Sequence, residues 1–209
     1  MNTAADHLVI FLMFIPILSI HEAAHAWVAH LLGDDTARDE GRLTLNPASH
    51  IDLWGTCIIP ALSLFVFSGA PLGWGRPVPV TGSNFRNWRR DEVIVALAGP
   101  VANLLLTVAV AGIAVALGPA STFRPLCVTF AYVSAFLGLL HLLPIPLFDG
   151  WTILRTLFDI PGEWEERAGI WISLAVLAVF NFTPLIAYLS LAAQLAVNSC
   201  AALFGGAAA

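Results

Sequence analysis

The sequence predicts an all-α polytopic membrane protein, and two observations support this fold class. First, 58% of the 209 residues are hydrophobic and 11% are charged, whereas a soluble domain carries about 25% charged residues. Second, long apolar segments alternate with polar connectors, and a helix of roughly 20 apolar residues crosses a bilayer. The composition excludes an ordinary cytosolic enzyme, a disordered segment and a nucleic-acid-binding protein, and it indicates the lipid bilayer as a partner.

Six apolar segments account for the expected helices. They fall at about 8–32, 53–73, 91–118, 125–147, 168–182 and 184–204. The first seven residues contain no Lys or Arg, so the first segment is expected to be a retained span rather than a signal peptide. The length suits one integral-membrane domain over residues 1–209 with about five or six transmembrane helices. Its core is expected over 8–155, followed by C-terminal helices over 168–204.

The second apolar segment, 53–73, has two possible paths. Its length, about 20 residues, favours a full span, whereas Pro60 within it favours a broken or re-entrant path. Arginine placement bears on the choice because cytoplasmic loops carry an excess of positive charge. A re-entrant path places eight of the nine arginines on one side and Arg124 alone on the other, whereas a full span divides them six to three. The residues alone leave both paths open.

Short strand elements are expected in the polar connectors that follow the first two apolar segments. Residues 42–45 alternate in polarity, and so do residues 76–81, where Pro77 and Pro79 rule out a central strand. An edge strand exposes unpaired backbone groups, which can dock an extended peptide. The sequence therefore predicts strand or re-entrant elements between the first helix and the central one.

An HExxH motif lies inside the first apolar segment, at residues 21–25. Positions i and i+4 share one face of a helix, so His21 and His25 can bind one zinc ion there. Glu22 then lies beside the metal and can accept a proton from water. Titratable side chains are costly in hydrocarbon and need a partner, which favours a metal over a polar packing cluster.

A zinc site needs a third protein ligand and an open position for water. Glu40 is one candidate, but it lies in the polar run DDTARDE, which is typical of a solvated surface. Asp149 is better placed, because it follows an apolar helix that Pro144 and Pro146 interrupt. Such broken helices line cavities in membrane proteins. The spacing leaves open whether Asp149 binds a metal or caps a turn.

These motifs together resemble the site-2 protease family of intramembrane zinc metalloproteases. An HExxH span and a later Pro-rich span that ends in Asp-Gly are the central match. Further stretches resemble the compact prokaryotic branch of the family: 41–47 (GRLTLNP), 50–52 (HID), 73–80 (GWGRPVPV), and 98–100 (AGP) with Asn103. The resemblance covers roughly residues 15–155 and includes none of the regulatory domains that are often appended in this family.

The resemblance implies a function and a site. His21, His25 and Asp149 would bind Zn²⁺, and Glu22 would be the general base. The substrate would be a transmembrane segment of another protein, cleaved in a prokaryotic inner or plasma membrane. Both ligand-bearing helices run the same way in the family, which favours a re-entrant 53–73.

One departure from the family pattern bears on catalysis. Histidine stands at position 141, where the family usually has an asparagine eight residues before the ligand aspartate. Histidine can still donate a hydrogen bond, so His141 is expected to stabilise the oxyanion. It could instead act as an extra metal ligand, or signal lost activity. The alternative function is therefore a non-proteolytic zinc-binding membrane protein that binds transmembrane partners.

Overall fold

The computed structural model describes residues 3–67, 69–161, 171, 175 and 183–206. Within these ranges the ordered elements are helices, and four of them are long and apolar enough to cross a membrane. They are α1 (Ala4–Leu31), α4 (Trp88–Leu117), α5 (Arg124–His141) and α8 (Leu185–Leu203). Four of the six predicted segments are thus long helices, and 168–182 falls almost wholly outside the described residues.

Helix α1 turns a polar stretch of its second half toward the protein interior. Its start is fixed by a capping box, in which the side chain of Thr3 accepts a hydrogen bond from the backbone of Asp6. Leu8 and Leu12 in the first half are at least half exposed, as suits contact with lipid. Ten of the helix residues are buried, and they include His21, Glu22 and His25. The motif residues therefore face neighbouring helices rather than the surrounding lipid.

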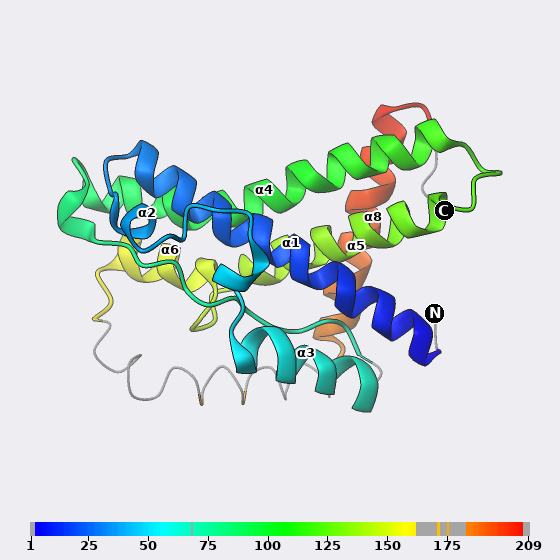
Figure 1. Ribbon diagram of the computed structural model, residues 1–209, viewed down its shortest axis with the longest axis horizontal. Coiled ribbons are helices and arrows are strands. Elements are labelled where there is room, and N and C mark those ends of the chain that lie inside the picture. Colours follow the sequence, from blue (N-terminus) through cyan, green and yellow to red (C-terminus); the bar gives the residue numbers. More distant parts are fainter. Residues whose placement is uncertain (1–2, 68, 162–170, 172–174, 176–182, 207–209) are drawn as a thin grey trace.

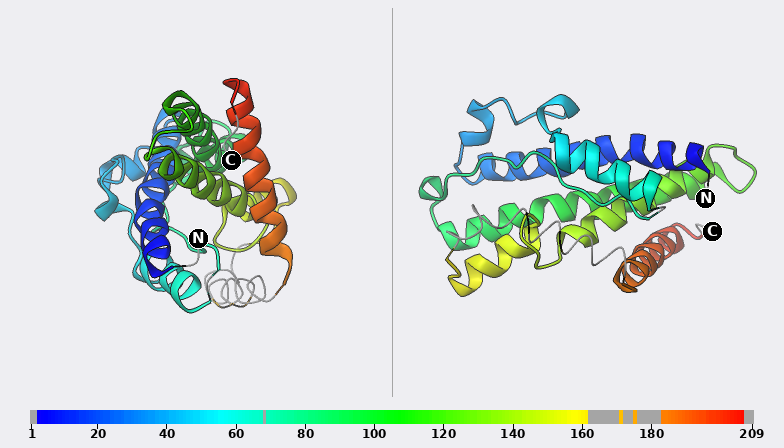
Figure 2. Two further views of the ribbon diagram at one scale, coloured as in Figure 1. Left: turned by 90° about the vertical axis from the view of Figure 1, so that its right-hand side faces the viewer. Right: turned by 90° about the horizontal axis from the view of Figure 1, so that it is seen from below.

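Helix α4 is the central element and packs against α1, α5 and α8. Its buried face carries mainly small or polar residues: Ala96, Gly99, Pro100, Asn103, Thr107, Ala111 and Ala114. Small side chains let helix backbones approach closely in a membrane. Figures 1 and 2 show α1, α4 and α5 lying alongside one another, with α8 crossing them at a steep angle. Helices α1 and α5 run in the same direction, and α4 runs against them (Figure 1).

The second apolar segment is not a long helix. Leu53–Val66 forms a short helical unit, in which α3 (Ile59–Ala61) lies between two π-helical turns, Leu53–Ile58 and Leu62–Val66. Its 14 residues would span about 21 Å, less than the hydrocarbon core of a bilayer. The chain then returns to its starting point, where the Trp74 N–H donates to the Gly55 carbonyl over 3.1 Å. The described helix is thus shorter than the full span that the sequence left open, and the chain turns back after it.

The strands expected at 42–45 and 76–81 do not form. Both segments are irregular, and no strand occurs anywhere in the described part of the chain. Only one backbone hydrogen bond ties 76–81 to the earlier connector, from the Arg76 N–H to the His50 carbonyl over 2.8 Å. Pro77 and Pro79 have no N–H with which to continue a ladder. Side chains, rather than a paired strand, therefore have to hold this segment in place.

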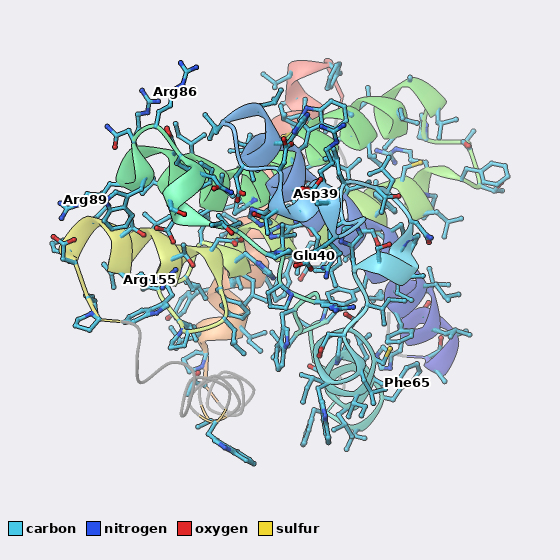
Figure 3. The ribbon with its side chains drawn as sticks, turned by 60° about the vertical axis from the view of Figure 1, so that its left-hand side comes forward. Asp39, Glu40, Phe65, Arg86, Arg89 and Arg155 are labelled. Atoms are coloured by element: carbon cyan, nitrogen blue, oxygen red, sulfur yellow. The ribbon has the colours of Figure 1, made fainter. Side chains whose placement is uncertain are left out.

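Helix α6 (Asp149–Phe158) follows the turn after α5 and packs on α4. Two ion pairs join these helices: Arg155 Nη2 lies 2.8 Å from Glu92 Oε1, and Arg89 binds the carboxylate of Asp159. Figure 3 shows Arg89 and Arg155 near each other at this end of the molecule. The pairs tie the C-terminal half of α6 to the start of α4.

Candidate metal centre

The structure brings His21, His25 and Asp149 together. The Asp149 carboxylate lies 3.0 Å from His21 Nε2 through Oδ2 and 3.2 Å from His25 Nε2 through Oδ1. One donor atom from each of the three residues lies within 4.8 Å of the others. Both histidines are buried, and their ring centroids are 4.7 Å apart. Glu40, the other candidate ligand, is exposed on the connector after α1 (Figure 3).

Asp149 reaches the histidines because α5 ends before it. The helix stops at His141, and the turn that follows includes Leu147 with φ of 76°. Phe148 is the N-cap of α6 and makes no side-chain capping bond, and Asp149 is the first helical residue. The Asp149 carboxylate therefore points to two imidazoles from α1, which is the arrangement that a metal ligand requires.

Gly99 leaves space beside the two imidazoles. A Cβ atom at this position would lie 2.4 Å from His25 Nε2 and 2.5 Å from His21 Nε2. A hydrogen in place of that carbon lets α4 approach the site while leaving room for an ion. Two histidines and one carboxylate are also the donor set of many catalytic zinc sites, which keep a fourth position open. The residues present thus fit a zinc ion.

Each histidine turns Nε2 toward Asp149 and uses Nδ1 for another contact. His25 Nδ1 donates to the Val95 carbonyl over 2.7 Å. His21 Nδ1 lies 3.1 Å from the side-chain amide of Asn103. The sequence identified Asn103 only as part of a stretch that resembles the family, although its position four residues after Gly99 places both on one face of α4. That spacing was the signal that could have identified it.

Glu22 is buried at the edge of a cavity of about 360 Å³. His25, His141 and Asp149 also line this cavity. On its other side lies the segment after the short helical unit, where Gly75 is pressed against Glu22. A Cβ atom on Gly75 would lie 2.4 Å from Glu22 Oε1. The carboxylate therefore lies between the candidate metal ligands and a wall of backbone, where water or a peptide could reach it.

His141 contacts the ligand carboxylate and lies outside the ligand set. Its Nδ1 is 3.1 Å from Asp149 Oδ2, and its ring stacks on Phe148 with centroids 5.0 Å apart. Among the described residues, nothing hydrogen-bonds to its buried Nε2. The side chain also lines the cavity. The geometry thus leaves one ring nitrogen of His141 without a hydrogen-bond partner among the described residues, on a side chain that lines the cavity.

Buried polar side chains hold the wall segment 74–81 in place. Thr56 donates to the Trp74 carbonyl over 3.0 Å, and Arg42 donates to the Arg76 carbonyl. His50 is fully buried nearby, and its Nε2–H donates to the Thr44 carbonyl over 2.7 Å. Burial, together with the charge of Arg42, lowers the pKa of His50 despite that hydrogen bond. His50 is therefore a neutral structural residue and is absent from the metal-ligand set.

Asp34 fixes the far end of the wall segment. This fully buried carboxylate accepts hydrogen bonds from the Thr81 N–H and the Asn84 amide, each over 2.8 Å. It also accepts from the backbone and hydroxyl of Thr36. Burial alone would raise the pKa of Asp34, but these hydrogen bonds outweigh it and leave the pKa below its usual value. Asp34 thus ties the wall to the connector after α1 as a carboxylate.

The fold and the site define a membrane protein with a candidate catalytic zinc centre. Bacillus subtilis YwhC, whose name describes a candidate zinc metalloprotease, is 36% identical over 153 residues, or 69% of this chain and 66% of that protein. Mycolicibacterium smegmatis Rip2, named in the same way, is 33% identical over 147 residues, or 66% of this chain and 52% of that protein.

The chain therefore belongs to the site-2 protease family. It spans about two thirds of the first relative and about half of the second. No family model matches the chain, and no solved structure matches it.

Proposed function

We propose that the protein is an intramembrane zinc metalloprotease that cleaves transmembrane segments of other proteins. The observation that carries this proposal is the position of Glu22. It faces a cavity beside three potential zinc ligands, inside a helix long and apolar enough to cross the membrane. His25 is six residues before the end of α1 at Leu31, or about 9 Å along the axis. The site would thus act on a segment below the membrane surface.

In the proposed mechanism, His21, His25 and Asp149 would hold zinc, which when bound would lower the pKa of water and polarise the scissile carbonyl. Glu22 accepts a proton from the attacking water and transfers it to the leaving amine as the peptide C–N bond breaks. His141, with both ring nitrogens protonated, donates a hydrogen bond from Nδ1 to Asp149 and from Nε2 to the oxygen that gains negative charge. The unpartnered Nε2 of His141, on a side chain that lines the cavity, supports this role.

The substrate must be unwound before cleavage, because helical carbonyls are already hydrogen-bonded. Of the two proposed docking edges, 76–81 is the better supported, because Pro77, Val78 and Val80 line the cavity with Glu22. Residues 42–45 are not part of that lining. We propose that an extended substrate pairs with the backbone of the wall segment.

The docking proposal can be tested with two matched proline variants. Val78→Pro removes an N–H from the wall segment and should lower cleavage while zinc content stays constant. Leu45→Pro removes one from the other candidate edge and should leave cleavage unchanged. The opposite pattern would move docking to 42–45, and wild-type cleavage by both variants would exclude strand pairing.

The catalytic proposal is tested by comparing wild type with Glu22→Gln on a panel of single-span membrane substrates in liposomes. Zinc is quantified in both proteins. Cleavage lost with zinc retained is the expected result, because a glutamine cannot accept the proton. Equal cleavage by both proteins would exclude Glu22 as the base. Zinc without cleavage in the wild type, and again in His141→Asn, would favour the non-proteolytic alternative.

The proposed setting is a prokaryotic plasma membrane, with the arginine-bearing connectors on the cytoplasmic side. The contact between Asn84 Nδ2 and Thr36 Oγ1, over 3.4 Å, supports a common side for the connectors after α1 and before α4. Single cysteines at 36 and 84 should therefore react with an impermeant thiol reagent from the same side of the membrane. Reaction from opposite sides would exclude the re-entrant path for 53–73.

A further inference from the structure

Asn103 is a buried polar residue in the middle of α4. Its side chain is completely excluded from solvent, and its Nδ2 lies 3.1 Å from His21 Nδ1. Its Oδ1 is buried and has no hydrogen-bond partner in the described part of the chain. Leaving a buried polar atom unpaired is costly, so this amide should have a specific purpose.

The chemistry of a metal-bound histidine determines which amide atom should face His21. An imidazole that binds zinc through Nε2 presents a lone pair there and carries its proton on Nδ1. Nδ1 is then a donor and needs an acceptor. A half-turn of the Asn103 amide exchanges Nδ2 and Oδ1 and places the oxygen at His21. This exchange sacrifices no hydrogen bond, because only one of the two amide atoms has a partner.

We infer that Asn103 is the positioning residue for His21 and accepts the Nδ1–H bond through Oδ1 when zinc is bound. The inference rests on the zinc site of the proposed function and is independent of proteolysis. It gives both histidines the same arrangement, because His25 Nδ1 already donates to the Val95 carbonyl. One bond uses backbone and the other uses the amide of Asn103, so that only the bond to His21 can be removed by substitution.

The backbone around Asn103 is held firmly enough to orient the imidazole. Its carbonyl accepts hydrogen bonds from the Thr107 hydroxyl over 2.8 Å and from the Ser134 hydroxyl over 2.9 Å. Ser134 belongs to α5, so the residue that contacts α1 through its side chain is fixed to α5 through its backbone. Residues that orient metal-bound histidines typically contribute 10- to 100-fold to metal affinity.

The test measures zinc affinity by chelator competition on the full-length protein in detergent. Asn103→Leu has similar size but no acceptor and should weaken zinc binding about 10- to 100-fold. Asn103→Asp keeps an acceptor but cannot donate, and should bind within about threefold of wild type, on the order of the context dependence of such contacts. Ser63→Ala is the control, because it removes a hydrogen bond to the Ala70 carbonyl that involves neither Asn103 nor His21.

Three outcomes would overturn the inference. One is wild-type affinity in Asn103→Leu, and another is an equal loss of affinity in Ser63→Ala. The third is a loss in Asn103→Asp as large as that in Asn103→Leu, which would show that the amide donates or only fills space. If Asn103→Leu does not fold, as judged by thermal unfolding without metal, Asn103→Asp alone decides between acceptor and donor. Cleavage is not measured, so failure of the protease proposal leaves this result intact.

Discussion

Gly99→Ala should abolish zinc binding while preserving the helical fold. The added methyl carbon would lie 2.4 Å from His25 Nε2 and 2.5 Å from His21 Nε2. A comfortable non-bonded contact is about 3.5 Å, so one side must yield by about 1 Å. Metal–ligand distances tolerate only about 0.2 Å. We therefore expect zinc affinity to fall by more than about 100-fold, which exceeds the usual effect of residues that only orient ligands.

The cost to folding of the same substitution should be small. Overpacking costs about 1–3 kcal/mol, but alanine is favoured over glycine in a helix by about 1 kcal/mol. The melting temperature without metal should therefore change little, and zinc should no longer raise it. Gly112→Ala is the matched control in α4, because its Cβ would meet only the tip of the half-exposed Phe204 ring. Zinc binding by Gly99→Ala within about threefold of wild type, well inside the range for orienting residues, would refute this account of the site.

Three further predictions concern the base, the wall and the metal. Gly75→Ala should abolish cleavage and retain zinc, because its Cβ would lie 2.4 Å from Glu22 Oε1; parallel cleavage and zinc assays check this. Asp34→Asn should lower the melting temperature at neutral pH. Because the pKa of Asp34 is lower in the folded state, the carboxylate stabilises the fold at pH values above the unfolded pKa of about 4. This stabilisation is lost as the pH falls through the folded-state pKa, which melting temperatures at several pH values would test. Chelation should lower the melting temperature, since zinc at 100 times its dissociation constant adds about 2.7 kcal/mol.

The parts of the fold that depend on local periodicity could be predicted from the sequence. The apolar segments 8–32 and 91–118 correspond to α1 and α4 within a few residues at most ends. The HExxH spacing placed His21 and His25 on one face, because that follows directly from helical geometry. The interruption of the apolar segment 125–147 by Pro144 and Pro146 was also expected, and α5 ends at His141, shortly before them.

The parts of the fold that depend on contacts between residues distant in the sequence could not be predicted from hydropathy or motif spacing. Hydropathy alone permitted a full span at 53–73, whereas the return path depends on specific bonds, such as Ser63 Oγ to the Ala70 carbonyl and Trp74 to Gly55. The alternation at 76–81 suggested a strand. The neighbouring segments, however, contact these residues mainly through side chains such as Arg42 and Asp34 and do not provide a paired strand. The contact of Asn103 with His21 joins residues 82 positions apart. From the sequence, only the position of Asn103 on the same face of α4 as Gly99 indicates that it lies near the site.

The site has two parts, the zinc ligands and the wall segment 74–81, and substitutions should be able to disturb each part separately. The zinc ligands depend on close helix packing, in which Gly99 sets the distance between α4 and the imidazoles. The wall opposite Glu22 is irregular and depends on buried polar side chains, chiefly Asp34 and Arg42. A change at Gly99 should therefore act first on zinc affinity, and a change at Asp34 first on cleavage with zinc retained. If both variants lost zinc to the same extent, the wall and the metal centre would have to be one cooperative unit.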